Sequence, residues 1–146
     1  MRRGLVLLVV AGLILSGCSL FGPVRVGTRL ANWSEQNIGE LGEPRPRQLL
    51  IVDDAAWQQW LAEQPPEIRE SAPDPDFSTA VVVAGSYPRC FDVSEVWDDG
   101  DGVLRFDTWI PRDKRTVSCA WSPVELEIWQ VALAELGVER GEVRLA

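Results

Sequence analysis

The feature that most constrains this chain is the apolar run close to its start. Met1-Arg2-Arg3 is a short basic beginning, and residues 4–15 are apolar almost throughout. A run of this length is too short to cross a bilayer comfortably, and its layout is typical of a secretory signal. We therefore expect residues 1–17 to be removed as a signal peptide, so that the core is built outside the cytoplasm from the residues that follow.

Leu15-Ser16-Gly17-Cys18 ends this run. The motif resembles the lipobox of bacterial lipoproteins, in which a diacylglycerol is attached to the cysteine and the preceding peptide is cut away. The resemblance implies that Cys18 is the lipidation site, with palmitate-type acyl chains contributing roughly 0.8 kcal/mol per buried methylene. It also implies attachment to the cell membrane or the outer membrane, facing the extracytoplasmic side. An ordinary signal peptide with an incidental Cys18 and an uncleaved N-terminal anchor are the alternatives, and both keep the domain outside the cytoplasm.

The balance of charge limits the possible partners. Removal of residues 1–17 takes away Arg2 and Arg3 but no acid, which leaves 12 basic and 22 acidic side chains and a net charge of −10. Nucleic-acid phosphates and anionic lipid headgroups both require a basic surface. The composition therefore argues against a nucleic-acid partner and against a polybasic contact with the membrane.

The chain contains no histidine, which excludes histidine-based triads, histidine metal sites and the commonest general base. The turn Asp98-Asp99-Gly100-Asp101-Gly102 resembles half of a calcium loop, but the acid that would complete an EF-hand pattern is missing. Most of the other carboxylates are expected in helix caps, turns and outward strand positions. The sequence thus predicts a protein that is not an enzyme, with no catalytic residue, no metal and no cofactor.

Cys90 and Cys119 are the cysteines left after lipidation of Cys18. In an exported domain an even pair of cysteines predicts a disulfide, which would stabilise the fold by roughly 3 kcal/mol for a loop of about thirty residues. A free reactive pair and a metal site are the alternatives, although two thiols without histidine make a poor zinc site.

Residues 18–46 are rich in glycine and proline, which indicates a spacer between the lipid and a single domain at residues 47–146. Trp33 and Ile38 support a second interpretation, in which the later part of this segment packs on the domain as an irregular first strand. The two interpretations remain open.

The domain itself is predicted to be α+β, with a small antiparallel sheet of about five or six strands, one packed helix and one disulfide. A helix capped by Asp53 or Asp54 carries Trp57 and Trp60 on one face, and Pro65-Pro66 ends it. Strands are expected at residues 49–52, 79–87, 91–97, 103–107 and 124–131, and residues 142–145 can close the sheet. Residues 124–136 also fit a helical stripe, but no capping box opens a helix there, so we favour a strand followed by a helical turn at 133–136.

The order of these elements resembles the PrcB family of lipoproteins, named after a subunit of a surface protease complex. The resemblance covers residues 48–131: Asp76-Phe77-Ser78 enters an Ala/Val strand, Gly85-Ser86 leaves it, and a hairpin and a cysteine-bearing strand at 116–121 precede Val124-Glu125-Leu126-Glu127-Ile128. The chain departs from the family at Tyr87-Pro88-Arg89-Cys90, where a glycine-rich turn is expected. The resemblance implies a domain without catalytic residues that binds or stabilises other envelope proteins.

Four tryptophans on the expected sheet form the candidate binding surface, namely Trp97, Trp109, Trp121 and Trp129. Exposed on one face they would suit a glycan or a protein partner, whereas beneath the helix they would fill the core. The sequence as a whole indicates a membrane-anchored, non-catalytic accessory subunit that binds an envelope protein. The alternative function is binding of a small molecule or a cell-wall glycan through surface tryptophans, and the oligomeric state is not determined.

Overall fold

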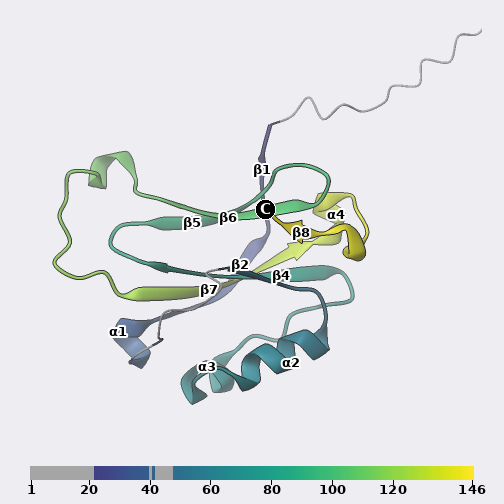
Figure 1. The fold of residues 1–146 in the computed structure, drawn as a ribbon, viewed down its shortest axis with the longest axis horizontal. Coiled ribbons are helices and arrows are strands. Elements are labelled where there is room, and N and C mark those ends of the chain that lie inside the picture. Colours follow the sequence, from purple (N-terminus) through teal and green to yellow (C-terminus); the bar gives the residue numbers. More distant parts are fainter. Residues whose placement is uncertain (1–21, 40, 42–47) are drawn as a thin grey trace, which may run out of the picture.

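The computed structural model describes residues 22–39, 41 and 48–146, and these form two four-stranded sheets stacked face to face (Figure 1). Sheet A has the order β1-β5-β6-β8, with strands at Val24–Val26, Val93–Asp98, Val103–Trp109 and Arg144–Leu145. Sheet B has the order β2-β7-β4-β3, with strands at Thr28–Ser34, Val124–Ala132, Ala80–Pro88 and Gln48–Ile51. All neighbouring strands are antiparallel except β6 and β8, which are parallel.

The helices are short, and two of them cover the face of sheet B that is turned away from sheet A (Figure 1). The α-helices are α1 (Glu35–Ile38), α2 (Asp54–Ala62), α3 (Pro66–Ser71) and α4 (Leu133–Leu136), and the 3-10 turns are η1 (Arg112–Lys114) and η2 (Arg140–Glu142). Within the described residues, no helix is long and apolar enough to cross a bilayer.

The predicted α+β class and the disulfide are confirmed, but the expected number of strands is wrong. The described residues form eight strands in two sheets, not five or six in one. The difference arises largely because β1 and β2 lie in the segment interpreted as a spacer, where each adds an edge strand to a different sheet. Residues 24–38 therefore pack on the domain, as two strands and a helical turn where the second interpretation expected one irregular strand, and the folded unit starts before residue 47.

Gly27 is the point at which the chain passes from sheet A to sheet B. It separates β1 from β2 and has a φ angle of +80°, in the left-handed region that favours glycine. A Cβ atom at this position would lie 2.8 Å from the carbonyl oxygen of Gln130. A side chain at residue 27 would therefore be both strained and too close to β7.

The second helix against sheet B was also not expected. The sequence predicts one helix, ended by Pro65-Pro66, but α3 begins at Pro66 and buries Ile68 completely. Proline is well tolerated in the first turn of a helix, so Pro65-Pro66 both ends α2 and begins α3. Trp33 of β2 donates a hydrogen bond of 2.9 Å to Ser71 at the end of α3, which ties this helix to the sheet.

Other local predictions are confirmed. Asp53 caps α2 by accepting a hydrogen bond of 2.8 Å from the amide of Ala56, and Trp57 is buried and stacks on Trp60. The hairpin of β5 and β6, and β7 followed by the helical turn α4, also form as expected.

The strand expected at residues 116–121 is not formed. The amide of Val117 donates to the carbonyl of Lys114 in a turn, and the chain then passes through Cys119 as a loop. This segment is held by the 3-10 turn η1 and by the disulfide at Cys119, and it does not pair with the edge of either of the described sheets.

Candidate functional site

A buried carboxylate, that of Glu127, lies between the two sheets. Glu127 is fully buried on β7 and accepts hydrogen bonds from the Tyr87 hydroxyl at 3.1 Å, the Trp129 Nε1 at 2.9 Å and the Ser94 hydroxyl. The guanidinium of Arg29 forms an ion pair with the same carboxylate at 3.0 Å. We call these five residues the Glu127 cluster. It joins β2, β4 and β7 of sheet B to β5 of sheet A.

The expectation that most carboxylates occupy caps, turns and outward strand positions does not hold for Glu125 and Glu127. Both lie on the face of β7 that is turned toward sheet A, and at most 4% of each residue is exposed. Glu95 lies on the outward face of β5 but is also buried, with 9% of the residue exposed. Alternation along a strand identifies the residues that share a face, but it does not show whether another sheet covers that face. The sequence does contain a sign of this burial. Glu125 and Glu127 alternate in step with Trp129 and Val131, so all four share one face of the strand, and the two apolar residues indicate that this face is covered.

Glu125 and Glu95 have different partners. Glu125 forms an ion pair of 3.3 Å with Arg89 and accepts a long hydrogen bond of 3.4 Å from Asn32. Glu95 lies on the outer face of sheet A and pairs with Arg25 through one carboxylate oxygen. Among the residues that the structure describes, its other oxygen is buried without a hydrogen-bond partner.

Tyr87 has an altered acidity that follows from its surroundings. Burial, and next the nearby charge of Glu127, together raise the pKa of its hydroxyl from the ordinary 10.0 to about 12. The phenol therefore stays protonated in ordinary conditions and acts as a hydrogen-bond donor to Glu127.

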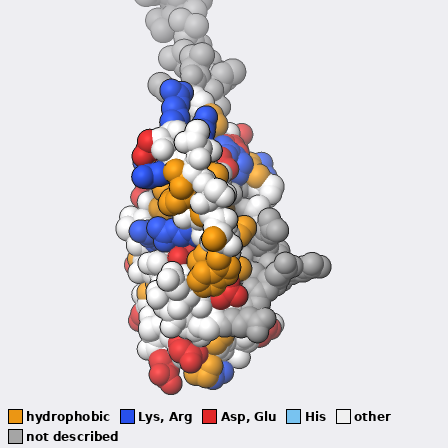
Figure 2. Space-filling model, turned by 90° about the vertical axis from the view of Figure 1, so that its left-hand side faces the viewer, with side chains coloured by type: hydrophobic (Ala, Val, Ile, Leu, Met, Phe, Trp, Pro, Cys, Tyr) orange, Lys and Arg blue, Asp and Glu red, His pale blue; other side chains and the backbone are white. Residues whose placement is uncertain are grey.

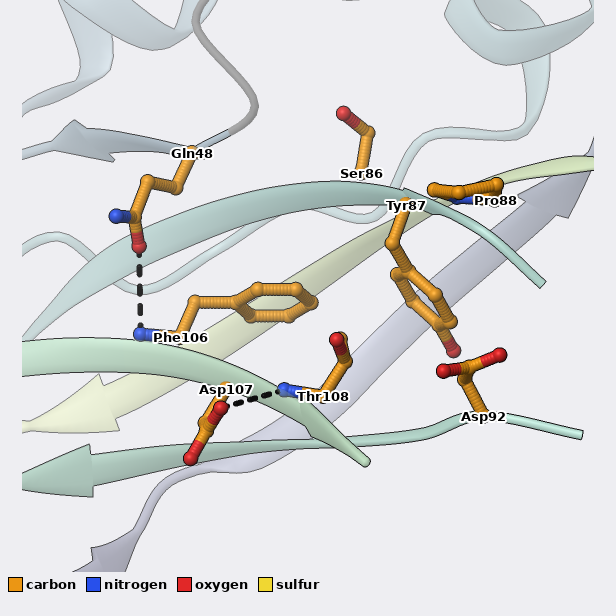
Figure 3. A pocket seen from close by; sticks show the side chains of 8 residues that line it. All are labelled: Gln48, Ser86, Tyr87, Pro88, Asp92, Phe106, Asp107 and Thr108. Atoms are coloured by element: carbon orange, nitrogen blue, oxygen red, sulfur yellow. Dashed lines mark hydrogen bonds between the residues drawn. The ribbon is translucent and has the colours of Figure 1, made fainter. Parts of the chain in front are cut away.

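An open cavity of about 360 Å³ lies beside the Glu127 cluster, between β4 and the β5–β6 hairpin (Figure 3). We call it the inter-sheet pocket. Its lining consists of Gln48, Ser86, Tyr87, Pro88, Asp92, Phe106, Asp107 and Thr108. Figure 3 shows the side chains of Tyr87, Phe106, Thr108 and Asp92 pointing into this space, whereas that of Asp107 points away from it.

The two aromatic rings that line the pocket, those of Tyr87 and Phe106, are held in place by contacts with neighbouring strands. The Tyr87 and Phe106 rings lie 6.0 Å apart and are tilted by 48°. The Phe106 ring lies so close to Gly85 that a Cβ atom there would clash with it. Gln48 accepts a hydrogen bond of 3.4 Å from the amide of Phe106, on the side of β6 away from β5.

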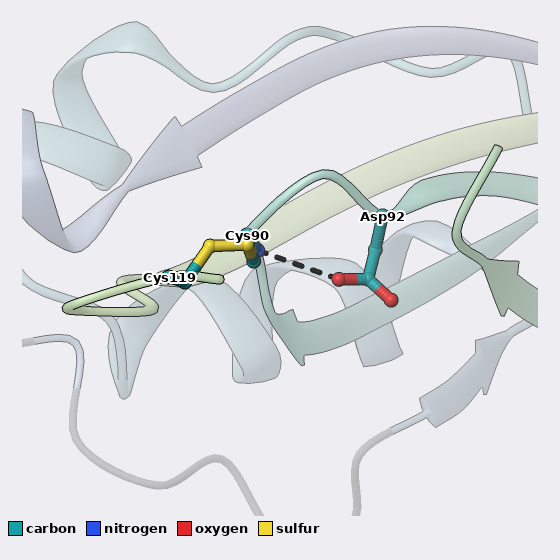
Figure 4. The surroundings of a disulfide bond; sticks show 3 residues. All are labelled: Cys90, Asp92 and Cys119. Atoms are coloured by element: carbon teal, nitrogen blue, oxygen red, sulfur yellow. Dashed lines mark hydrogen bonds between the residues drawn. A yellow bond between two sulfur atoms is a disulfide. The ribbon is translucent and has the colours of Figure 1, made fainter. Parts of the chain in front are cut away.

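The disulfide closes the end of the molecule next to this pocket. Cys90 and Cys119 are bonded, as predicted, and join the β4–β5 loop to the β6–β7 loop (Figure 4). The amide of Cys90 donates a hydrogen bond of 3.4 Å to the carboxylate of Asp92. The bridge thus restrains the turn that carries Asp92 into the pocket. The lipidation candidate Cys18 lies outside the described residues.

The four candidate tryptophans do not form one surface. Trp97 and Trp109 share the outer face of sheet A, where the Arg25 guanidinium lies 5.7 Å from the Trp97 ring centroid. Trp129 belongs to the Glu127 cluster inside the protein. Trp121 lies on the β6–β7 loop, not on a strand, and is 58% exposed. The sequence correctly placed three of them on strands, but strand pairing distributed them over separate faces.

No metal-binding arrangement is found within the part of the chain that the structure describes, since no three His, Cys, Asp or Glu side chains are grouped to hold an ion.

No protein-family model, curated protein sequence or solved structure matches this chain, so its function has to be argued from its own residues.

Proposed function

We propose that this protein is a lipid-anchored extracytoplasmic lipoprotein, PrcB-like in its domain, that acts as a non-catalytic binding or stabilising subunit of an envelope complex. The lipobox-like Leu15-Ser16-Gly17-Cys18 supports the anchor. The disulfide supports an oxidising compartment, because such bonds rarely persist in the cytosol.

The observation that carries the binding role is a set of exposed apolar side chains on the loops and strand ends near the disulfide, which we call the disulfide end. Its members are Val93, Ile110, Val117 and Trp121, each at least 37% exposed. Val93 pairs with Trp109, directly before Ile110, while Val117 and Trp121 flank Cys119. Figure 2 looks onto this end and shows hydrophobic side chains in the middle of the face, with both basic and acidic side chains beside them.

Exposed large apolar side chains that gather on one surface are a mark of protein interfaces, and tryptophan is prominent among residues that contribute most to binding. The disulfide holds these loops together, which lowers the conformational entropy lost on binding. The β6–β7 loop also carries Arg112, Lys114 and Arg115 in a chain of net charge −8. A partner that presents an apolar surface bordered by acidic side chains would complement it.

The test is a cross-linked pull-down of the native protein from envelope membranes, read by mass spectrometry. We expect one stoichiometric protein partner that is lost in the Trp121→Ser variant and retained in Leu30→Ala, since Leu30 is an exposed apolar residue on β2, outside the disulfide end. Recovery of the same partner with Trp121→Ser, or of no partner at all, would contradict the proposal.

The anchor has its own test, because it can fail independently. The Cys18→Ser variant should leave the membrane fraction and appear in the soluble extracytoplasmic fraction. Unchanged membrane retention would mean that the apolar run is an uncleaved anchor and that lipid does not hold the protein.

A second function, binding of a cell-wall glycan, is favoured by the outer face of sheet A. Trp97 and Trp109 share this face with the Glu95–Arg25 ion pair, and both tryptophans are partly exposed. Aromatic rings and hydrogen-bond acceptors are the groups that hold sugar rings. Retention of peptidoglycan fragments by the wild type, with loss of retention in Trp97→Ala and Trp109→Ala, would support this role in place of the first.

A further inference from the structure

The inter-sheet pocket is separate from both surfaces discussed above, and its walls define a ligand chemistry. We propose that it binds a small organic cation, an alkylammonium or alkylguanidinium group, that rests against the wall formed by the Tyr87 and Phe106 rings and pairs with the Asp92 carboxylate. This inference does not depend on the protein partner proposed above.

The aromatic walls are preorganised for such a ligand. Tyr87 is buried, and its hydroxyl is held by the carboxylate of Glu127. Phe106 is packed over Gly85, and Figure 3 shows its ring extending into the pocket. Two fixed rings that face a cavity attract a cation through their negatively polarised faces. A neutral ligand of the same shape would gain the apolar contact but not this attraction.

The charge in the pocket comes mainly from Asp92. Asp107 already has a partner, since its carboxylate lies 2.7 Å from the Arg105 guanidinium and also accepts a hydrogen bond from the amide of Thr108. Among the described residues, no lysine or arginine pairs with Asp92, whose only hydrogen bond is the long one from the Cys90 amide. An entering cation would supply the missing partner of Asp92.

The remaining polar groups of the pocket can also accept hydrogen bonds from a donor. The Tyr87 hydroxyl uses its hydrogen in the bond to Glu127, so it offers only its oxygen to a ligand. Thr108 can accept through its hydroxyl, and Gln48 accepts through its amide oxygen. The net charge of the chain, −8, adds a field that attracts cations and repels anions.

The volume of the pocket limits the size of the ligand that it can hold. A volume of about 360 Å³ is at the lower end of the range for small-molecule sites. It accommodates a short amine or guanidine, either as a free molecule or as the basic side chain of a peptide. Both sources present the same group to Asp92 and the rings.

The test compares two probes of nearly the same shape, butylguanidinium and neutral butylurea, in titrations of the folded, isotope-labelled protein followed by NMR. We expect saturable shifts of the amides of Asp92, Phe106 and Thr108 with butylguanidinium and none with butylurea. The Asp92→Asn variant should bind about tenfold more weakly or worse, the loss expected for one charge-assisted hydrogen bond. Asp113→Asn is the matched control, because Asp113 is an exposed aspartate outside the pocket, and it should bind like the wild type.

Several outcomes would overturn the proposal: equal binding of butylurea, unchanged affinity in Asp92→Asn, shifts spread over the acidic surface, or no saturation. A blocked Gly-Arg-Gly peptide distinguishes the two sources of the cation. Tighter binding of the peptide than of butylguanidinium, with shifts that extend along β6, would assign the cation to a protein side chain. Binding of butylguanidinium alone would assign it to a free small molecule.

Discussion

At the scale of single residues, Glu127 is the most informative side chain in the protein. A carboxylate can accept about four hydrogen bonds, and Glu127 receives three, from Tyr87, Ser94 and Trp129, together with the ion pair to Arg29. Burial of a charge is tolerated when such partners replace the lost water. Because Ser94 belongs to sheet A and the other residues to sheet B, these bonds also orient the two sheets relative to each other.

The first prediction concerns the charge of Glu127. In Glu127→Gln one acceptor oxygen becomes an NH₂ group that faces hydrogen-bond donors, so we expect the free energy of unfolding to fall by about 2–3 kcal/mol. Urea denaturation measures this loss. Glu70→Gln, an exposed glutamate of α3, serves as the control and should unfold like the wild type. Identical urea midpoints for Glu127→Gln and the wild type would show that the cluster contributes nothing to stability.

The second prediction concerns Tyr87, the only tyrosine of the chain, so that phenolate absorbance reports this residue alone. We expect the folded protein to titrate near pH 12, whereas the unfolded chain should titrate near 10.0. Because the pKa is higher in the folded state, the associated stability is fully present below pH 10 and is lost as the pH rises from about 10 to about 12.

The Tyr87→Phe variant provides the comparison for this titration. It should lack the loss of stability between pH 10 and pH 12, while losing about 1 kcal/mol at neutral pH through the missing hydrogen bond to Glu127. A phenolate that forms at the same pH in the folded and the unfolded protein would contradict the buried environment of Tyr87.

At the scale of elements, the loops and edges depend on a few constraints that act between distant segments. The disulfide connects the β4–β5 loop to the β6–β7 loop across a separation of 29 residues, with Cα atoms 6.0 Å apart. At their base the two loops are also joined by a hydrogen bond of 2.8 Å from the amide of Arg89 to the carbonyl of Pro123. The disulfide end and the turn at Asp92 both rely on the disulfide for their shape.

The third prediction concerns this bond. Replacing both Cys90 and Cys119 by serine should lower the free energy of unfolding by about 3 kcal/mol in the chain-entropy model. The measurement is chemical denaturation of the double variant and of the wild type without reductant. The intact mass of the wild type should be two hydrogens below that of its reduced form. Labelling of both thiols in the native protein without reductant would rule out the bond.

At the scale of the whole molecule, one short segment completes both sheets. β1 pairs with β5 in sheet A, and β2 pairs with β7 in sheet B, although only Gly27 separates the two strands in the chain. The same segment supplies Arg29 to the Glu127 cluster. The stacking of the sheets therefore depends on residues that a domain boundary at residue 47 would leave out.

The fourth prediction compares two shortened chains. A chain that starts at Gly22 keeps every described strand and should unfold in one cooperative thermal transition. A chain that starts at Arg47 lacks β1 and β2, exposes the edges of β5 and β7 and leaves Glu127 without Arg29, so we expect it to aggregate or to lose the cooperative transition. Equal thermal transitions of the two chains, measured by circular dichroism, would contradict this role of the segment.

The sequence by itself determined much of the local structure of this protein, although α3 and the strands β1 and β2 were not among the elements that it predicted. The Asp53 cap, the tryptophans of α2, the buried strand β4, the β5–β6 hairpin and the change from β7 to α4 all follow from patterns within about fifteen residues. The disulfide followed from counting, because only Cys90 and Cys119 remained to pair. The caps, helices and hairpin could be predicted because residues close together in the chain decide them, whereas the disulfide could be predicted because no other pairing of the two cysteines was possible.

Only the tertiary structure decided which faces are covered. The hydrogen bonds of Glu127 with Tyr87 and Arg29 span 40 and 98 residues of the chain, and no local pattern carries that information. The division into two sheets, the inter-sheet pocket and the exposure of Trp121 have the same origin. Alternation along β7 groups Glu127 with Trp129 on one face, but whether that face meets water or a second sheet depends on strands that arrive from elsewhere in the chain.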